Sequence, residues 1–429
     1  MTLRLLAVGD LHLGRQPGGL PEALTTRLDT RQLGPAGALR RIVDVAIARE
    51  VDAVAFAGDL VEQEDDFFEA YGDLHAAVAA LHGAGIAVVG IAGNHDVRVL
   101  PYLADEVEAF QLLGRDGTWD SVVLSGSDGV EAVLHGWSFP EARVAVSPLR
   151  DHVFSRDRRP ALGLLHCDRD QSGSIHAPVT RAELAGAGLD GWLLGHIHKP
   201  DDLSPASPGG YLGSATALRR SETGPRGPWL WTIGAEGIRS IEHWPLAPLR
   251  WEPLEVSLDG IAEAEDARSR LLRVATETAG RIIEQQHRPE ALGFRVEFTG
   301  RTDLRQAVAS MLASEDLSDI AGVDGLHCFV GRYHFATLPE LDLERLARRG
   351  DPAGLLAQRL LLLDEDPATP DRRDLLARAR ARLESAAREP AWQPLNPNEP
   401  GDDELAGWLR EAAATALDEL LAQHRETAA

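Results

Sequence analysis

Five apolar runs of the chain each end in a short polar segment, and this repeated pattern constrains the fold more than any other feature. The clearest example is the run IAVVGIA at residues 86–92, which leads directly into Gly93-Asn94-His95-Asp96. An apolar run of this length, bounded by glycine, is typical of a strand buried in a parallel sheet. Open α/β sheets place ligands at the carboxyl ends of such strands. The polar quartet is therefore predicted to lie at the ligand-binding edge of an α/β sheet.

The other four runs deliver the same residue types to what we expect to be the same edge of a sheet. Their polar segments are Gly9-Asp10-Leu11-His12, Gly58-Asp59, His166-Cys167-Asp168 and Gly195-His196-Ile197-His198. A single Asp or His after a strand is usually a cap or turn residue. Five strand ends that together supply nitrogen and oxygen ligands, without a set of thiolates, describe a metal site.

The net charge limits how the chain could act on a polyanion. It carries 43 basic and 67 acidic residues, a formal charge of −24. Such a chain should repel nucleic acid at long range, so bound cations, local arginine clusters or a basic partner would have to supply affinity for that substrate. A basic interval precedes the fourth run, and it could be either a phosphate-contacting surface or a solvated loop. Its members are Arg143, Arg150, Arg156, Arg158 and Arg159.

Composition also limits the compartment and the chemistry. No apolar stretch approaches the length of a membrane span, and residues 1–4 lead into the first apolar run without a signal-peptide pattern. We therefore expect a soluble cytoplasmic protein that does not contact a membrane. Cys167 and Cys328 lie far apart and form no CxxC unit, so neither a disulfide framework nor a thiolate zinc site is indicated.

The order of apolar patterns divides the chain into three regions. Residues 1–250 are predicted to form one α/β domain, and residues 251–340 a small α+β domain. Helices dominate residues 341–429, where a proline-rich stretch at 390–400 suggests a stiff linker. The last helix, expected at 403–424, has an apolar face that could pack on its own domain or on a partner.

At the five motifs the chain resembles the calcineurin-like metallophosphoesterases. The resemblance continues through Gly136-Trp137-Ser138-Phe139, Gly213-Ser214, Glu222 and Gly224-Pro225-Arg226-Gly227. This longer pattern is similar to the SbcD-type DNA repair exonucleases, which work with an SMC-like ATPase. The resemblance implies an α/β fold with a calcineurin-like β-sandwich flanked by helices, followed by a small α+β capping domain and C-terminal helices.

The resemblance also implies a ligand set for two divalent cations, with manganese favoured, although the ligands suit Mn²⁺, Fe²⁺ or Zn²⁺. One cation would be held by Asp10, His12 and His198, the other by Asn94, His166 and His196, and Asp59 would bridge them. A carboxylate can span two cations, and cations on the order of 3.5–4 Å apart can clamp a phosphoryl group and acidify a bridging water. His95 would protonate the leaving oxygen or stabilise its charge, and Asp96 could orient the His95 ring. No role is assigned to the remaining histidines, which include His75, His82, His135, His152 and His176.

The leading hypothesis is a dinuclear metal-dependent phosphodiesterase that hydrolyses DNA as an exo- or endonuclease. It would be the DNA repair subunit beside an SMC-like coiled-coil ATPase, and the resemblance allows a homodimer. Some nuclease members of the family carry a further histidine after the second motif, whereas this chain has Leu60-Val61-Glu62 there. Cleavage direction and substrate preference therefore stay open. The alternatives are a metallophosphatase or phosphodiesterase for small-molecule or protein phosphoesters, and a non-catalytic metal-bound scaffold.

Overall fold

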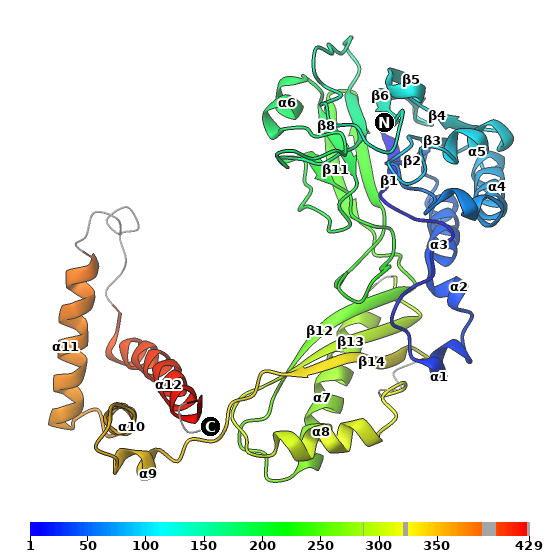
Figure 1. The fold of residues 1–429 in the computed structure, drawn as a ribbon. Coiled ribbons are helices and arrows are strands. Elements are labelled where there is room, and N and C mark those ends of the chain that lie inside the picture. Colours follow the sequence, from blue (N-terminus) through cyan, green and yellow to red (C-terminus); the bar gives the residue numbers. More distant parts are fainter. Residues whose placement is uncertain (286, 321–324, 388–399, 427–429) are drawn as a thin grey trace. The chain divides into compact units, whose positions relative to one another are not determined.

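The computed structural model describes residues 1–285, 287–320, 325–387 and 400–426 (Figure 1). These residues form two compact units, of which the first comprises residues 1–256, 265–298 and 309–334. The remaining described residues form the second unit. The linker predicted at 390–400 lies outside the described residues as far as residue 399.

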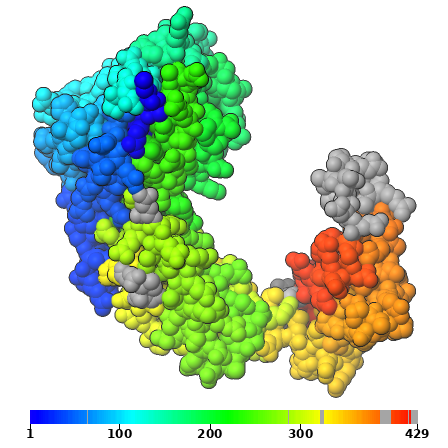
Figure 2. Space-filling model, turned by 180° about the vertical axis from the view of Figure 1, so that it is seen from behind, coloured from blue at the N-terminus to red at the C-terminus, as the bar shows by residue number. Residues whose placement is uncertain are grey.

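The first sheet of the larger unit contains the first three apolar runs. Its strands are β1 (Leu3–Val8), β2 (Ala53–Phe56), β3 (Ala87–Gly90), β4 (Phe110–Leu112), β10 (Trp229–Gly234) and β11 (Gly237–His243). They are arranged in the order β11-β10-β1-β2-β3-β4, and β1 to β4 run parallel to one another. Strand β10 pairs antiparallel with β1, and the first residues of the chain lie at the surface in dark blue beside green segments from later in the chain (Figure 2).

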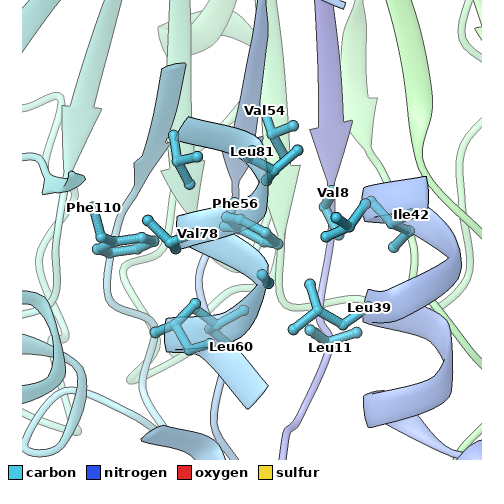
Figure 3. Packing of buried hydrophobic residues seen from close by; sticks show 14 of the residues in the cluster. Val8, Leu11, Leu39, Ile42, Val54, Phe56, Leu60, Val78, Leu81 and Phe110 are labelled. Atoms are coloured by element: carbon cyan, nitrogen blue, oxygen red, sulfur yellow. The ribbon is translucent and has the colours of Figure 1, made fainter. Parts of the chain in front are cut away.

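Helices α3 (Pro35–Ala48) and α4 (Phe67–Gly83) cover one face of this sheet. Leu39 and Ile42 of α3 recur at helical spacing, as the sequence predicted, and point into the core beside Val8 (Figure 3). Val78 of α4 packs on Phe56 of β2 in the same cluster (Figure 3). Burial of this apolar stripe fixes both helices on the sheet and thereby orients the loops that follow β1 and β2.

A second sheet lies against the other face of the first. Its strands are β5 (Trp119–Ser125), β6 (Glu131–Trp137), β7 (Ala161–His166), β8 (Gly191–Gly195) and β9 (Gly209–Tyr211), paired in that order and parallel from β6 to β9. Leu5 and Ala55 of the first sheet share a buried cluster with Leu162 and Leu193 of the second. The predicted β-sandwich flanked by helices is therefore confirmed.

A third sheet contains β12 (Leu249–Ser257), β13 (Ala291–Thr299) and β14 (His327–Phe335), in that order. Helix α7 (Ala264–Ile283) lies between β12 and β13 in sequence, and α8 (Arg305–Ser314) between β13 and β14. Trp251 of β12 and Phe329 of β14 are buried with Leu24 of α1 (Glu22–Thr25) and Leu33 of α2 (Thr30–Leu33). Strands and helices alternate in this part of the chain, and the domain bounds 251–340 stay a prediction.

Helices α9 (Leu343–Ala347), α10 (Pro352–Leu363), α11 (Pro370–Ala387) and α12 (Asp402–Glu426) belong to the second unit. Leu417 of α12 is buried with Leu346 of α9 and Leu360 of α10, and Leu405 of α12 is buried with Leu376 of α11. The apolar face of the last helix thus packs on its own unit, which answers a question that the sequence left open.

The remaining helices and 3₁₀ turns among the described residues are short, and the longest of them has seven residues. They are α1 (Glu22–Thr25), α2 (Thr30–Leu33), α5 (Leu100–Glu106), α6 (Arg181–Gly186) and the 3₁₀ turns η1 (Glu64–Asp66) and η2 (Arg115–Gly117). Within the described ranges, no helix has the length and apolar character needed to cross a membrane.

Candidate metal centre

The sandwich gathers the five polar segments at one end, but it does so from two sheets. Asp10, Asp59 and Asn94 follow β1, β2 and β3 of the first sheet, whereas His166 ends β7 and His196 follows β8 of the second. The sequence had predicted a single sheet edge, and that prediction was wrong. The segments still converge because both sheets contribute parallel strands whose carboxyl ends lie at the same end of the sandwich.

One group of side chains contains Asp10, His12 and His198, which each offer a ligand atom within 4.8 Å of the others. Nε2 of His12 lies 3.1 Å from Nε2 of His198. The Asp10 carboxylate accepts a hydrogen bond from the His196 amide at 2.9 Å through Oδ1. Its Oδ2 is buried and has no hydrogen-bond partner among the described residues.

A second group contains Asp59, His166 and His196 within the same 4.8 Å limit. Oδ2 of Asp59 lies 3.3 Å from Nε2 of His166 and 4.0 Å from Nε2 of His12, so this carboxylate faces both groups. Oδ1 of Asn94 lies 3.1 Å from Nε2 of His166 and 3.1 Å from Nδ1 of His196. The structure therefore brings together all seven residues to which the sequence assigned a metal.

Each of the four imidazoles has one ring nitrogen against an acceptor outside the centre. Nδ1 of His12 lies 2.7 Å from Glu62 Oε2, and Nδ1 of His198 lies 2.9 Å from Glu222 Oε1. For His166 the acceptor is the Ala57 carbonyl, 3.0 Å from Nδ1, and for His196 it is Asp168 Oδ1, 3.2 Å from Nε2. Because carboxylates and carbonyls only accept hydrogen bonds, we assign the hydrogen of each neutral ring to its outer nitrogen, although Nδ1 of His12 is not aligned with Glu62 for a hydrogen bond.

The inner ring nitrogens consequently face one another without hydrogens when the rings are neutral. Two such lone pairs 3.1 Å apart, as between His12 and His198, repel each other unless a cation lies between them. The orphaned oxygen of Asp10 and the amide oxygen of Asn94 add further acceptors to the same space. This mixed set of imidazole, carboxylate and amide ligands fits divalent cations, and the outer acceptors are the partners that metal-binding histidines use.

The backbone is strained where it presents three of these residues. His12, Asp59 and His196 have φ values of 59°, 48° and 98°, a region that costs non-glycine residues about 1–3 kcal/mol each. The glycines beside them permit close approach. A Cβ on Gly93 would lie 2.2 Å from Asp59 Oδ1. Strain at several ligands of one centre is typical of functional sites, where the surrounding structure holds the backbone in place.

Charges within the centre reinforce each other. Burial opposes ionisation of Asp59, but the adjacent His166 outweighs it and holds the pKa of this carboxyl below its usual range. Burial likewise works against protonation of His166, yet Asp59 and Asp10 raise its pKa to about 9. The carboxylates of Asp59 and Asp10 thus stabilise positive charge at this end of the sandwich.

His95 and Asp96 occupy different surroundings. The Asp96 carboxylate is fully buried and accepts hydrogen bonds from the amides of Leu60 at 2.7 Å and Gly93 at 2.8 Å. Burial, together with the charge of Asp59, raises its pKa to about 7. The exposed His95 ring instead places Nδ1 3.1 Å from the Glu62 carbonyl. Among the described residues, Asp96 thus ties two loops together, and Glu62 is the residue that orients the His95 ring.

Sequence reasoning missed the residues behind the ligands. Glu62 was noted only as a residue that follows the second motif, and Glu222 belonged to the family pattern without a role. Asp168 was recognised only as a strand-end residue, and His176 was given no function although its ring lies 5.1 Å from that of His196. Only the repeated position of Asp168 after an apolar run could have served as a signal, because the other contacts join segments distant in sequence.

The predicted basic interval is partly neutralised in the structure. Arg156 forms an ion pair with Asp190 at 2.7 Å, and Arg159 lies 3.1 Å from Glu131. Arg159 also pairs with Asp157. These two arginines are therefore less free to contact a phosphate than the sequence suggested.

The amino-acid sequence that forms this centre is similar to sequences of known proteins. Residues 3–200 match the family model described as calcineurin-like phosphoesterase. The chain is 26% identical over 308 residues to the uncharacterized metallophosphoesterase YhaO of Bacillus subtilis, covering 68% of this chain and 73% of YhaO. It is 29% identical over 301 residues to the DNA double-strand break repair protein Mre11 of Haloferax volcanii, covering 66% of this chain and 60% of that protein.

Two further similarities are more limited. Mre11 of Aeropyrum pernix is 29% identical over 234 residues, which cover 51% of this chain and 55% of that protein. Among solved structures, a dimetal phosphatase from Danio rerio matches with a TM-score of 0.34 and 13% identity, covering 56% of this chain and 96% of that one.

Proposed function

We propose that this chain is a dinuclear metal-dependent phosphodiesterase acting on DNA, because residues 3–200 match the family model described as calcineurin-like phosphoesterase. The observation that carries the proposal is the set of inward-facing ring nitrogens. When neutral, the four imidazoles present lone pairs to a space that also contains the oxygens of Asp10, Asp59 and Asn94. A site of this kind gains stability from two cations and is suited to binding a phosphate between them.

Asp10, His12 and His198 would hold one cation, and Asn94, His166 and His196 the other. Asp59 would contact both, since its Oδ2 faces His12 and His166. When bound, two divalent cations neutralise charge on a phosphoryl group and make a bound water more acidic. We propose Mn²⁺ as the physiological ion, since the carboxylate, amide and imidazole groups of this site suit Mn²⁺.

His95 is our candidate for the residue that acts on the leaving group. Its Nδ1 is directed at the Glu62 carbonyl, and its ring lies edge-on to His12 with centroids 5.1 Å apart. The exposed ring therefore holds a fixed orientation beside one ligand group. We propose that Nε2, on the opposite side of the ring from the Glu62 contact, hydrogen-bonds or protonates the leaving oxygen.

DNA is favoured as the substrate because two relatives are named as DNA double-strand break repair proteins. The formal charge of −24 makes unaided binding to DNA unfavourable at long range. We therefore propose that an SMC-like ATPase partner supplies duplex binding in the cytoplasm, and that the chain cleaves as the nuclease subunit and as one copy of a homodimer. Cleavage of small phosphoesters without a partner is the competing function.

The test is hydrolysis by the purified full chain with Mn²⁺. The substrates are linear duplex DNA, single-stranded DNA and bis(4-nitrophenyl) phosphate, and the variants are Asp59→Ala and His95→Ala. Both variants remove groups that face the centre, so we expect both to lose hydrolysis by at least about a hundredfold. Only Asp59→Ala should also lose metal, which direct measurement of bound Mn²⁺ would show. His82→Ala, an exposed substitution on α4, is the matched control.

The substrates separate the proposed activities. Cleavage of DNA that both variants abolish supports the nuclease. Hydrolysis of the small ester alone, even after an SMC-like ATPase is added, would refute the DNA assignment and favour a small-molecule phosphodiesterase. Binding of Mn²⁺ without hydrolysis of any of the three substrates would favour the metal-bound scaffold.

A further inference from the structure

His176 lies beside the metal centre although no sequence motif includes it. Its ring centroid is 5.1 Å from that of His196, and the two rings are tilted by 38°. His176 is not among the groups whose ligand atoms converge within 4.8 Å. The side chain is half-buried, and the neighbouring side chains of His196 and Asp168 are 18% and 13% exposed. His176 therefore flanks the second ligand group on a side that solvent reaches.

A hydrogen-bonded turn fixes the position of His176. Its carbonyl accepts from the Asp168 amide at 2.8 Å, and its own amide donates to Ser174 Oγ at 3.0 Å. The Ser174 hydroxyl in turn donates to Asp168 Oδ2. Asp168 also contacts His196 through its other oxygen, so one carboxylate links the turn to the proposed ligand.

A second chain segment and the local backbone hold the turn from the other side. The Val144 amide donates to the Ile175 carbonyl at 2.7 Å, and the Ala177 amide donates to the Val144 carbonyl at 2.8 Å. Ala177 is buried with φ of 48°, a left-handed conformation that is costly for alanine. Contacts on both sides thus hold His176 in one place, as a residue that must present its ring to a ligand requires.

The two ring nitrogens of His176 have different surroundings. Nδ1 is shielded from solvent and has no hydrogen-bond partner among the described residues. A hydrogen on Nδ1 would be buried without an acceptor, which is unfavourable. Nε2 is not among the shielded atoms, so a ligand can reach it and accept a hydrogen bond from the tautomer that carries its hydrogen there. In that tautomer the ring offers a donor that solvent can reach, beside the ring of His196.

We propose that His176 is a substrate-binding residue whose Nε2–H donates a hydrogen bond to a non-bridging oxygen of the phosphodiester bound at the metal centre. The inference rests on the proposed function, since it assumes that the phosphate lies against the second ligand group. It assigns to the turn 168–176 a task that some family members give to a histidine after the second motif. In this chain the segment after the second motif is Leu60-Val61-Glu62, and Glu62 contacts His12 at 2.7 Å and Arg15 at 3.1 Å.

The test compares two substitutions at the same position. His176→Phe keeps a ring against His196 but removes the donor, and His176→Gln keeps an amide donor near the place of Nε2. We expect His176→Phe to raise the KM for bis(4-nitrophenyl) phosphate about tenfold with little change in kcat, since it loses a hydrogen bond to a charged group. The dissociation constant of inorganic phosphate from the Mn²⁺-loaded protein should rise by the same factor, and His176→Gln should recover most of both losses.

His152→Phe is the matched control, because His152 is an exposed histidine that stacks on Trp119 with centroids 5.3 Å apart. Unchanged KM and unchanged phosphate affinity in His176→Phe would overturn the proposal. So would an equal loss of Mn²⁺ affinity, which would mean that the ring only supports His196. Phosphate binding is measured without turnover, so it tests His176 even if the wild type hydrolyses no phosphodiester and the proposed function fails.

Discussion

Glu222 offers a direct test of how the metal centre is held together. Its Oε1 lies 2.9 Å from Nδ1 of His198, and its Oε2 accepts a hydrogen bond from the Leu218 amide at 2.7 Å. The carboxylate is 11% exposed, so water cannot readily replace it. Glu222→Gln keeps one acceptor oxygen but puts an amide NH₂ where the other was, and this group cannot accept from a donor. Glu222→Ala removes both contacts.

The size of the effect follows from these contacts. Loss of the partner behind a metal-bound histidine typically weakens metal binding about 10–100-fold. We expect the loss of metal-binding free energy to be near the lower limit, about 1.4 kcal/mol, in Glu222→Gln. In Glu222→Ala we expect it to be near the upper limit, about 2.7 kcal/mol. The loss should affect one of the two cations, because Glu222 contacts only His198 among the proposed ligands.

Calorimetric titration with Mn²⁺ measures this effect as one weakened and one unchanged binding event. Glu242→Gln, an exposed change on β11, is the control for a lost carboxylate. Thermal melts of the metal-free variants show whether folding is retained. Two binding events with wild-type affinity in Glu222→Ala would refute the reasoning that outer acceptors orient the ligands.

Three further predictions concern packing and pH. Gly93→Ala should abolish Mn²⁺ binding in calorimetry, because the new Cβ would lie 2.2 Å from Asp59 Oδ1, whereas Gly72→Ala on α4, with no atom within 4 Å, should leave it unchanged. Burial lowers the pKa of His243 to about 4 from 6.5, so the unfolded chain binds a proton that the native imidazole excludes. Stability should therefore fall between pH 6.5 and pH 4 by about 3 kcal/mol, and His243→Phe should remove that part of the dependence in urea melts at each pH. Leu417→Ala should destabilise the helical unit by about 2–5 kcal/mol, seen as faster hydrogen exchange in α9, α10 and α12, with ester hydrolysis unchanged.

The sequence alone was sufficient to predict the residue types of the centre and the local elements that carry them. An apolar run buried on both faces reads as a strand of a parallel sheet, and the polar residues after it must lie at its carboxyl end. Asp10, His12 and Asn94 were found in this way, because strand, loop and ligand are adjacent in the chain. Spacing at three and four residues likewise identified α3 through Leu39 and Ile42.

Only the tertiary structure decided which groups stand behind the ligands and how the strands are divided. Glu62 lies 50 positions after His12, and Glu222 lies 24 positions after His198, so no local pattern connects either pair. Strand pairing decides how the apolar runs are divided between two sheets, and the sequence of an apolar run does not specify its pairing partner. The position of His176 depends on a turn and on a bridge to Val144 from another segment. These features are set by contacts between distant parts of the chain, which form only when burial of the sandwich core brings those parts together.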